Sequence, residues 1–436
     1  MDRELYQSFL NILEEELLPA MGCTEPIAVA YCAAEARRIL GAEPEQAVVE
    51  ASGNIIKNAK SVVVPNTGGL RGIPAAAAAG MVAGVPEQKL EVLSRITPAE
   101  QEAIRAFLAR TPVEVRLADT GRIFDLTVTV RHGADRVRVR IADYHTNIVL
   151  VEKNGRTLYS TPLDEGGGAG LTDRSLLTVE RILEFADMVE PADVRPLLER
   201  QISCNMAIAE EGLRGDYGAN LGSVLLTSQP EVLEAGGRSA LRLRARALAA
   251  AGSDARMNGC ELPVVINSGS GNQGITASVP VVVYARGLGL GDEKLLRALT
   301  LSNLIGIHLK TPIGRLSAFC GAISAGAAAG CGIAYLLDGS LDAVSHTLVN
   351  ALAIDSGVIC DGAKASCAGK TALAVDNGIL GYEMYCQGQQ FFGGDGIVKK
   401  GVENMIASVG RLGREGMRET DKEILHIMID QWLSGE

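Results

Sequence analysis

The sequence predicts an α+β protein in which a mostly helical domain, rich in small residues, carries a smaller domain with an antiparallel β-sheet inserted in its N-terminal half. Hydrophobic residues make up 47% of the 436 residues and aromatic residues only 4%, so the core must be built from aliphatic side chains and alanine. One central stretch alternates apolar and polar residues, whereas the rest of the chain spaces apolar residues by three or four. A chain of this length allows two or three domains.

Residues 1–90 are expected to form the first part of the helical domain. An amphipathic helix ends near Pro19, and a second helix runs from about Pro26 to Leu40, where Gly41 is a typical residue just beyond a helix C-terminus. The run AVVEASG then favours a strand. The stretch GGLRGIPAAAAAGMVAGVPEQ is typical of a glycine-rich turn followed by a helix of small residues.

Residues 91–172 are expected to form the smaller domain with its antiparallel sheet. Between about Pro112 and Ser160, apolar residues alternate with polar ones in two runs: Phe124, Leu126, Val128 and Val130, then Val137, Val139 and Ile141. Asn154-Gly155 stands between two further apolar runs, which is a strong indication of a β-hairpin.

Residues 173–436 are expected to form the rest of the helical domain. Three runs carry apolar residues at helical spacing: RSLLTVERILEFADMVE, VRPLLERQISCNMAIAEEGLR and SALRLRARALAAAG. No charged residue occurs from Leu316 to Leu337, which is about the length of a bilayer-spanning helix. This segment consists mostly of Gly, Ala, Ser and Cys, so we interpret it as a buried helix rather than a membrane span.

The charge and the N-terminus limit the class of protein. A formal net charge of -11 argues against a nucleic-acid-binding protein, which would show a basic patch or stripe, and against docking on an anionic membrane. The first residues, MDRELYQSFLNILEEELLPA, lack the basic and apolar regions of a secretion signal, so we expect a cytoplasmic protein. In that setting nine cysteines, an odd number, favour thiol, metal-binding or catalytic roles over disulfides.

Cys320, Cys360 and Cys367 are the strongest functional candidates. They stand in RLSAFCGAISAGAAAGCG and GVICDGAKASCAGK, where residues with almost no side chain would let a bulky inorganic group approach the backbone. Thiolates bind soft iron and zinc. Three thiolates on a cluster of four irons would leave one iron open to bind and polarise a substrate. The alternative is that these are buried free cysteines, which behave as small hydrophobic residues.

Cys23 is the fourth candidate, in the motif MGCTEP. Thr24 is a plausible N-cap and Pro26 suits the first turn of the helix that follows. A thiol at a helix N-terminus has its pKa lowered by the helix dipole, so we predict that Cys23 is a thiolate near neutral pH and acts as a base or nucleophile. Thr24 is counted among the substrate-binding candidates. The alternative is a turn cysteine that only packs.

Two glycine-rich runs are candidate anion-binding loops. In VVVPNTGGLRG, the side chains of Asn66 and Thr67 with Arg71 nearby would hold a small carboxylate, unless the run is an ordinary connection between a strand and a helix. The run INSGSGNQG contains the spacing of a dinucleotide-binding motif, at Gly269, Gly271 and Gly274. The motif needs a helix directly afterwards, and ITASVPVVVYARG, with Pro280 and β-branched residues, does not favour one.

We therefore interpret INSGSGNQG as a loop that holds a carboxylate through its backbone N–H groups and the side chains of Ser270, Asn272 and Gln273. The run DYHTNIV places His145 in a strand of the sheet, either facing a cleft as a substrate-binding residue or on the surface. The remaining cysteines have no spacing that indicates a site and are expected to be structural: Cys32, Cys204, Cys260, Cys331 and Cys386.

Four blocks together resemble the L-cysteine desulfidase family, which is related to the alpha chain of iron–sulfur-dependent L-serine dehydratases. They are MGCTEP, GGLRGIPAAAAAG, INSGSGNQG and the set of Cys320, Cys360 and Cys367, and the resemblance covers essentially the whole chain. It implies a [4Fe–4S] cluster held by those three cysteines and a further functional cysteine at Cys23. The implied reaction converts L-cysteine and water to pyruvate, ammonia and hydrogen sulfide without pyridoxal phosphate.

Two other functions remain open at this stage. An L-serine dehydratase would use the same cluster and differ only in the pocket for the substrate side chain. A non-catalytic metal protein would use Cys23 as a fourth ligand and serve as a sensor or hold structural zinc. A small amino acid is the expected partner, and a homodimer is compatible with the sequence.

Overall fold

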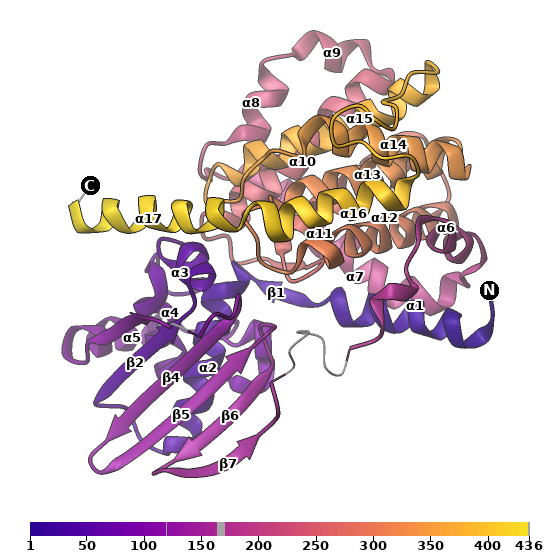
Figure 1. Cartoon of the computed structure of the whole chain (residues 1–436). Helices are drawn as coiled ribbons and strands as arrows, with labels where there is room; N and C mark the ends of the chain where they lie inside the picture. Colours follow the sequence, from indigo (N-terminus) through magenta and orange to yellow (C-terminus); the bar gives the residue numbers. More distant parts are fainter. Residues whose placement is uncertain (119, 164–170, 435–436) are drawn as a thin grey trace.

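The structure of the chain, a computed structural model that describes residues 1–118, 120–163 and 171–434, has one lobe built on a β-sheet and one lobe built from helices (Figure 1). This arrangement confirms the predicted α+β class. The N-terminus lies on the helical lobe, at the right of Figure 1. The last helix runs to the left of the view, between the helical lobe and α3 (Gly53–Ala59) of the sheet lobe.

A six-stranded sheet with the strand order β3-β2-β4-β5-β6-β7 forms the smaller lobe. Its strands are β2 (Gln46–Ala51), β3 (Val113–Leu117), β4 (Asp125–His132), β5 (Asp135–Ala142), β6 (Ile148–Lys153) and β7 (Arg156–Ser160). Neighbours run antiparallel except for β2 and β3, which are parallel. The prediction of an antiparallel sheet is therefore wrong for this pair, and the sheet is mixed. The hairpin at Asn154-Gly155 connects β6 and β7 as predicted.

The strand β2 lies before Glu91, so the sheet draws on residues that we assigned to the helical domain. The parallel pairing of β2 with β3 requires a long crossover, which the intervening helices provide. The helices of this lobe are α2 (Thr24–Leu40), α3 (Gly53–Ala59), α4 (Gly72–Ala83), η1 (Pro86–Glu91) and α5 (Pro98–Arg110). The division of the chain at residues 90 and 172 stays a prediction.

The helix α2 packs on β4 and β5 and connects the sheet to the rest of the molecule. The alternating residues Val128, Val130, Val137 and Val139 are fully buried, which explains the period of two in the sequence. At its C-terminus α2 stops where Gly41 adopts the left-handed conformation, with φ at 80°, as the sequence predicted.

The larger lobe is helical, as expected for residues 173–436. Its elements are α1 (Arg3–Glu16), η2 (Arg174–Leu176), α6 (Val179–Met188), α7 (Pro191–Arg214), α8 (Leu221–Thr227), α9 (Pro230–Ala235), α10 (Gly237–Met257), α11 (Gly271–Gly287), α12 (Asp292–Ile313), α13 (Gly321–Leu337), α14 (Leu341–Asp355), α15 (Cys367–Cys386), α16 (Val402–Arg411), η3 (Leu412–Gly416) and α17 (Arg418–Ser434). No helix in the described part of the chain combines the length and the apolar character needed to cross a bilayer.

Helix α13 is buried along nearly its whole length because small residues let its neighbours approach closely. A Cβ atom added to Gly378 of α15 would lie 2.1 Å from the carbonyl oxygen of Gly326 on α13. A Cβ atom added to Gly330 would lie 2.3 Å from the carbonyl oxygen of Gly378. The backbones of α13 and α15 are therefore in direct contact, as the alanine- and glycine-rich composition predicted.

Replacing Gly378 by valine is expected to lower the free energy of unfolding by about 3 kcal/mol or more, because the two helix backbones would have to separate. Thermal unfolding followed by circular dichroism measures the change. Gly291→Ala is the matched control, since a Cβ atom there meets nothing within 4 Å. Equal melting temperatures for the wild type and Gly378→Val would contradict the close packing of α13 on α15.

Candidate active site

Two short strand pairings bring four helix N-termini together. The ribbon of β1 (Pro19–Met21) and β8 (Pro263–Val265) is antiparallel, and each strand leads into the N-terminus of a helix. After β1 the chain reaches Cys23, the N-cap residue of α2, and after β8 it reaches Ser270, the N-cap residue of α11. The ribbon therefore places two segments that are far apart in the sequence side by side.

A second pairing fixes the other two helix N-termini. Phe319 and Ile359 form an antiparallel bridge, and the amides of Cys320 and Cys360 donate hydrogen bonds across it to the carbonyls of Val358 and Ala318. Cys320 is the N-cap residue of α13, and Cys367 is the first residue of α15. The partial positive charge of a helix N-terminus stabilises nearby anions, so this arrangement favours thiolates or another anionic group.

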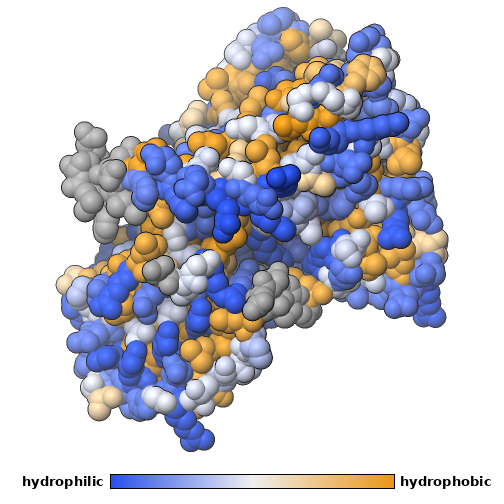
Figure 2. Space-filling model, viewed as in Figure 1, coloured by the Kyte–Doolittle hydropathy of each residue, from blue (hydrophilic) through white to orange (hydrophobic). Residues whose placement is uncertain are grey.

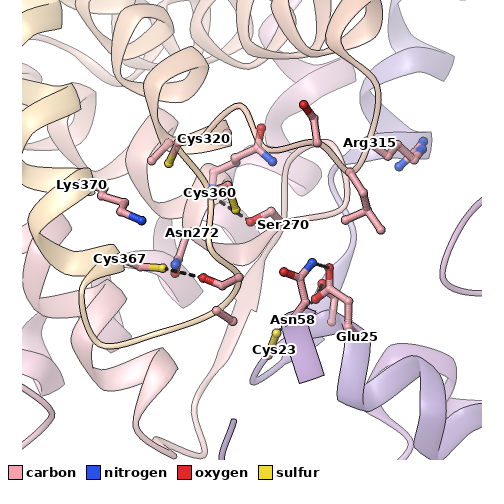
Figure 3. A pocket seen from close by; sticks show the side chains of 18 of the residues that line it. Cys23, Glu25, Asn58, Ser270, Asn272, Arg315, Cys320, Cys360, Cys367 and Lys370 are labelled. Atoms are coloured by element: carbon pink, nitrogen blue, oxygen red, sulfur yellow. Dashed lines mark hydrogen bonds between the residues drawn. The ribbon is translucent and has the colours of Figure 1, made fainter. Parts of the chain in front are cut away.

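A cavity of about 90 Å³ lies at this meeting point and is lined by all four candidate cysteines (Figure 3). Four of the other predicted site residues also line it: Thr24, Ser270, Asn272 and Gln273. The predicted site residues that line this cavity thus come from positions as far apart as 23 and 367.

The thiols of Cys320, Cys360 and Cys367 are free and bordered by small residues. Burial raises the pKa of Cys320 to about 12, with a further contribution from Cys360, and burial also raises the pKa of Cys367. The cysteines of a metal site can be protonated until metal binding displaces their protons. In the described part of the chain no group of three or more His, Cys, Asp or Glu side chains is gathered around a single metal position.

The donor set fits a cluster better than a single ion, because each cysteine of an iron–sulfur cluster binds its own iron and the sulfurs need not converge. Two glycines beside the cysteines allow neighbouring segments to pack closely around the cavity. A Cβ atom on Gly362 would lie 2.5 Å from the carbonyl oxygen of Lys57, and one on Gly321 would lie 2.7 Å from Cδ of Gln273. Two lysines, Lys310 and Lys370, also line the cavity and would offset the negative charge of thiolates.

Lys310 is buried, and this burial lowers the pKa of its amine to about 8, while Cys360 and Cys320 partly oppose the effect. Lys370 forms an ion pair with Asp361, which raises the pKa of its amine against the opposing effect of burial. Lys310 therefore contributes a positive charge to the cavity that no ion pair neutralises within the described residues, and this charge suits an anionic ligand.

The predicted thiolate at Cys23 is not what the structure shows. Burial, followed by the neighbouring carboxylate of Glu25, raises the pKa of the Cys23 thiol well above its usual range. The thiol is protonated and donates to Oε2 of Glu25 over 3.1 Å. Cys23 is the N-cap residue in place of Thr24, whose hydroxyl donates to Glu25 and to the carbonyl of Gly269. Burial outweighs the effect of the helix dipole on the thiol, because Cys23 is only 2% exposed.

His145 lies in the turn between β5 and β6, not in a strand, so that prediction is wrong. The turn buries the imidazole against Phe124 and places Nε2 3.7 Å from Oε1 of Glu25. His145 does not line the cavity itself but stands behind Glu25. Burial alone would raise the pKa of Glu25, yet His145 and Cys23 together lower it to about 2, so this carboxylate stays ionised.

The segment after Gly274 is the helix α11, which corrects the interpretation of this stretch as non-helical. Pro280 and the β-branched residues are tolerated because α11 is buried along almost its entire length, and tertiary packing overrides helix propensity. Among the residues that the structure describes, the preceding strand β8 pairs with β1 alone, and the pairing is antiparallel, whereas a dinucleotide-binding motif needs a parallel βαβ unit. Ser270 caps α11 by accepting a hydrogen bond from the amide of Gln273.

Asn66, Thr67 and Arg71 do not line the cavity. Asn66 donates to the carbonyl of Leu93, Thr67 donates to the carbonyl of Val64, and Arg71 is exposed and donates to the carbonyl of Ser61. The geometry gives these three residues a role in the connection between α3 and α4. Their role in substrate binding stays a prediction.

Comparisons with known proteins show the family of this chain. The family model for the serine dehydratase alpha chain matches residues 87–426, which is most of the chain. This chain belongs to the serine dehydratase alpha chain family. Proteins named UPF0597 are also similar to it along nearly their full length: one from Desulfitobacterium hafniense is 59% identical, with 98% of each chain covered. One from Lachnoclostridium phytofermentans is 47% identical, with 98% of this chain and 100% of the relative covered.

Membership of the serine dehydratase alpha chain family indicates an enzyme of the serine dehydratase type and confirms the relationship inferred from the four sequence blocks. Sequence reasoning missed several charged or polar residues that line the cavity, among them Glu25, Asn58, Arg256, Lys310, Arg315 and Lys370. Glu25 stands in the MGCTEP motif and could have been found there, since it is the carboxylate nearest to Cys23. Asn58, which donates to Oε1 of Glu25, carries no signal in the sequence.

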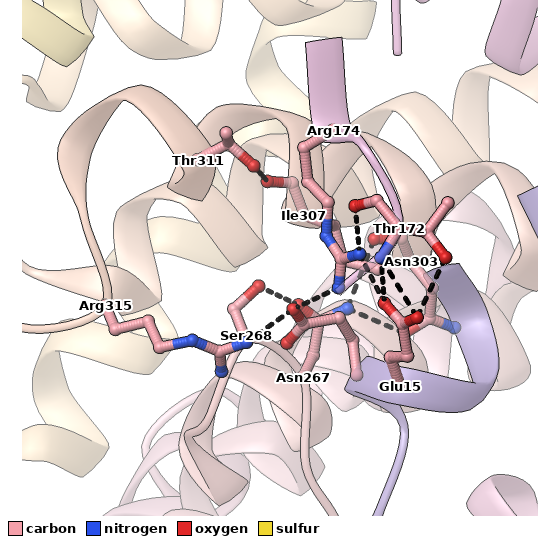
Figure 4. A network of polar contacts seen from close by, with 10 residues as sticks. Glu15, Thr172, Arg174, Asn267, Ser268, Asn303, Ile307, Thr311 and Arg315 are labelled. Atoms are coloured by element: carbon pink, nitrogen blue, oxygen red, sulfur yellow. Dashed lines mark hydrogen bonds and ion pairs between the residues drawn. The ribbon is translucent and has the colours of Figure 1, made fainter. Parts of the chain in front are cut away.

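A larger cavity of about 1050 Å³ lies next to the first and shares Lys310, Arg315 and Leu316 with it. Both lobes line it, through Arg122 and Asp143 of the sheet lobe and Arg174 of the helical lobe, among others. Arg174 and Arg315 both donate to Oε1 of Glu16. Figure 4 shows the side chains of the two arginines extending toward each other. Hydrophilic side chains also gather across the middle of the face in Figure 2, between the lobes.

Proposed function

We propose that this chain is an iron–sulfur-dependent lyase that converts L-cysteine to pyruvate, ammonia and hydrogen sulfide by α,β-elimination. The observation that carries the proposal is the presence of three free thiols, from Cys320, Cys360 and Cys367, at a cavity where four helices begin. Membership of the serine dehydratase alpha chain family supports the same class of reaction.

Cys320, Cys360 and Cys367 would hold a [4Fe–4S] cluster, whose one iron without a protein ligand supplies Lewis acidity toward the sulfur of the substrate. The rest of the chemistry falls to side chains of the chain itself. In the net reaction the Cα–H proton goes to a base, and the Cβ–S bond breaks with its electron pair on sulfur. The aminoacrylate that is left takes up water and gives pyruvate and ammonia.

Cys23 is the residue proposed to handle a proton beside the substrate. Its thiol is protonated and donates to Oε2 of Glu25, 3.1 Å away, so Cys23 can take the Cα proton only after the thiol has lost its own proton. His145 stands 3.7 Å from the other oxygen of Glu25 and can share the charge of that carboxylate. The three residues thus form one buried cluster of ionisable groups beside the cavity, in which a hydrogen bond joins Cys23 to Glu25 and His145 lies beyond hydrogen-bond distance.

The substrate-binding groups that the geometry supports are those at the start of α11. Ser270, Asn272 and Gln273 line the cavity, and Thr24 faces it from the start of α2. Helix N-termini bind carboxylates through free backbone N–H groups, so an amino acid substrate would be oriented with its carboxylate toward α11.

A second candidate is an L-serine dehydratase, which the description of the family favours directly. The same cavity would expel hydroxide in place of sulfide. A non-catalytic site with Cys23 as a fourth metal ligand is supported less well, because the Cys23 thiol is occupied with Glu25.

Anaerobic reconstitution with iron and sulfide, followed by assays of both amino acids, tests the proposal. We expect release of sulfide and pyruvate from L-cysteine with a higher kcat/KM than release of pyruvate from L-serine. A preference for L-serine would assign the chain as a serine dehydratase instead. A reconstituted protein that holds its cluster and acts on neither amino acid would contradict the lyase proposal.

A further inference from the structure

Arg256 is a buried cation that lacks an anionic partner. It stands in the last turn of α10, is 3% exposed, and lines the cavity of the four cysteines. Its Nη1 donates to Oδ1 of Asn272 over 3.1 Å, and its Nε is buried without any hydrogen-bond partner. Within the described ranges of the chain, no carboxylate forms an ion pair with its guanidinium.

An unpaired charge inside a protein is costly, and arginine is almost never fully buried unless it is paired. Loss of a proton cannot remove the charge of Arg256, because a guanidinium is not deprotonated in proteins. The missing partner is therefore expected to be an anion that enters the cavity. A neutral contact such as the amide of Asn272 satisfies one N–H group but does not balance the charge.

The backbone next to Arg256 is also arranged for an anion. A Cβ atom on Gly271, the first residue of α11, would lie 2.2 Å from Nε of Arg256, so only glycine lets the guanidinium lie against the first turn of that helix. The guanidinium and the N-terminus of α11, a helix of 17 residues, thus present positive charge from two independent sources to the same space.

We propose that Arg256 and the first turn of α11 form a carboxylate subsite that binds the α-carboxylate of the amino acid substrate. This inference rests on the proposed function and adds a requirement to it: the substrate must carry a free carboxylate. L-cysteine would be bound, whereas the corresponding amide and cysteamine would bind weakly at best. The anchor replaces Arg71, which is exposed and outside the cavity, as the arginine of substrate recognition.

The test measures binding of L-alanine and L-alaninamide to the reconstituted protein by isothermal titration calorimetry, since neither compound has a leaving group. The wild type is expected to bind L-alanine at least 30-fold more tightly than L-alaninamide. Arg256→Gln should lose most of this preference, a drop in L-alanine affinity of about 10- to 100-fold. Arg256→Lys should keep part of it, and Arg244→Gln, the matched control at an exposed arginine of the same helix, should keep all of it.

Two outcomes would overturn the subsite. One is unchanged L-alanine affinity in Arg256→Gln. The other is loss of bound iron in that variant with L-alanine affinity retained by the remaining holoprotein, which would mean that Arg256 balances the charge of the cluster alone. Because L-alanine binding is read without turnover, a dependence on Arg256 would support the subsite even if neither L-cysteine nor L-serine were converted.

A stability measurement separates this role from a structural one. Replacing Arg256 by methionine removes the uncompensated charge and keeps most of the side-chain volume, so the ligand-free variant should melt no lower than the wild type. A fall of several degrees would show that the charge is already compensated within the fold, and it would overturn the proposal.

Discussion

Replacing Cys320, Cys360 or Cys367 singly by alanine is expected to remove the visible absorbance of the reconstituted cluster and lyase activity together, by a factor of 1,000 or more. Each side chain would hold a separate iron, so no remaining residue of the set can substitute for the one that is lost. Lysines and helix N-termini at the cavity attract the cluster but provide no sulfur. Iron content and absorbance after anaerobic reconstitution measure the first effect, and pyruvate release measures the second.

Cys331→Ala is the control for this experiment. Cys331 is fully buried on α13, the helix that begins after Cys320, and its thiol lies against the carbonyl of Val344, away from the cavity. The variant should bind the wild-type amount of iron and lose only about 1 kcal/mol of stability. Full iron content in any of the three alanine variants of the cavity would remove that cysteine from the ligand set.

The sequence predicted some of the segments that meet at the cavity, because cysteines among glycines have few other roles, whereas the predicted loop of Asn66, Thr67 and Arg71 does not line it. Three cysteines among glycines and the MGCTEP motif stood out by composition alone, and all four thiols line one cavity. The period of two between Phe124 and Ile141 likewise predicted the sheet, since one side of each of these strands is buried. Local patterns of this kind can be interpreted from the sequence alone because burial, or the proposed binding of a cluster, determines which residue types occur.

Other features depended on contacts between distant segments and could not be predicted. The parallel pairing of β2 with β3 made the sheet mixed, and no local pattern distinguishes a parallel edge from an antiparallel one. Helix α11 forms despite Pro280 because the surrounding helices bury it. Arg256 is one of several arginines on α10, and only its position beside Gly271 marks it as a candidate ligand-binding residue.

The protonation of Cys23 shows why a local rule can fail at a functional site. A helix N-terminus lowers the pKa of an exposed thiol, but here burial and the charge of Glu25 act in the opposite direction and outweigh it. The MGCTEP motif already contains this carboxylate, two residues after the thiol. What the sequence could not provide is the depth of burial, which results from the ribbon of β1 and β8 and the packing of the loop around Ala363.

Replacing Cys23 by alanine is expected to leave the iron content and absorbance of the reconstituted protein unchanged and to lower kcat by about 100- to 10,000-fold, the usual contribution of a group that transfers protons. The fold should tolerate the change. Oε2 of Glu25 keeps its hydrogen bond from the hydroxyl of Thr24, and Oε1 keeps the one from Asn58, so no buried carboxylate oxygen loses its last partner. The expected loss of stability is about 1 kcal/mol.

Glu25→Gln tests the contact between Cys23 and Glu25 by changing the carboxylate in place of the thiol. Since the charge of Glu25 raises the pKa of the Cys23 thiol, its removal should lower that pKa, and Cys23 should react faster with iodoacetamide near neutral pH. The fraction of thiolate would increase, and if the Cys23 thiolate is the base, activity should rise at a lower pH than in the wild type. If Cys23→Ala instead loses iron together with activity, Cys23 is a fourth ligand, the iron has no open position, and the non-catalytic metal site becomes the better assignment.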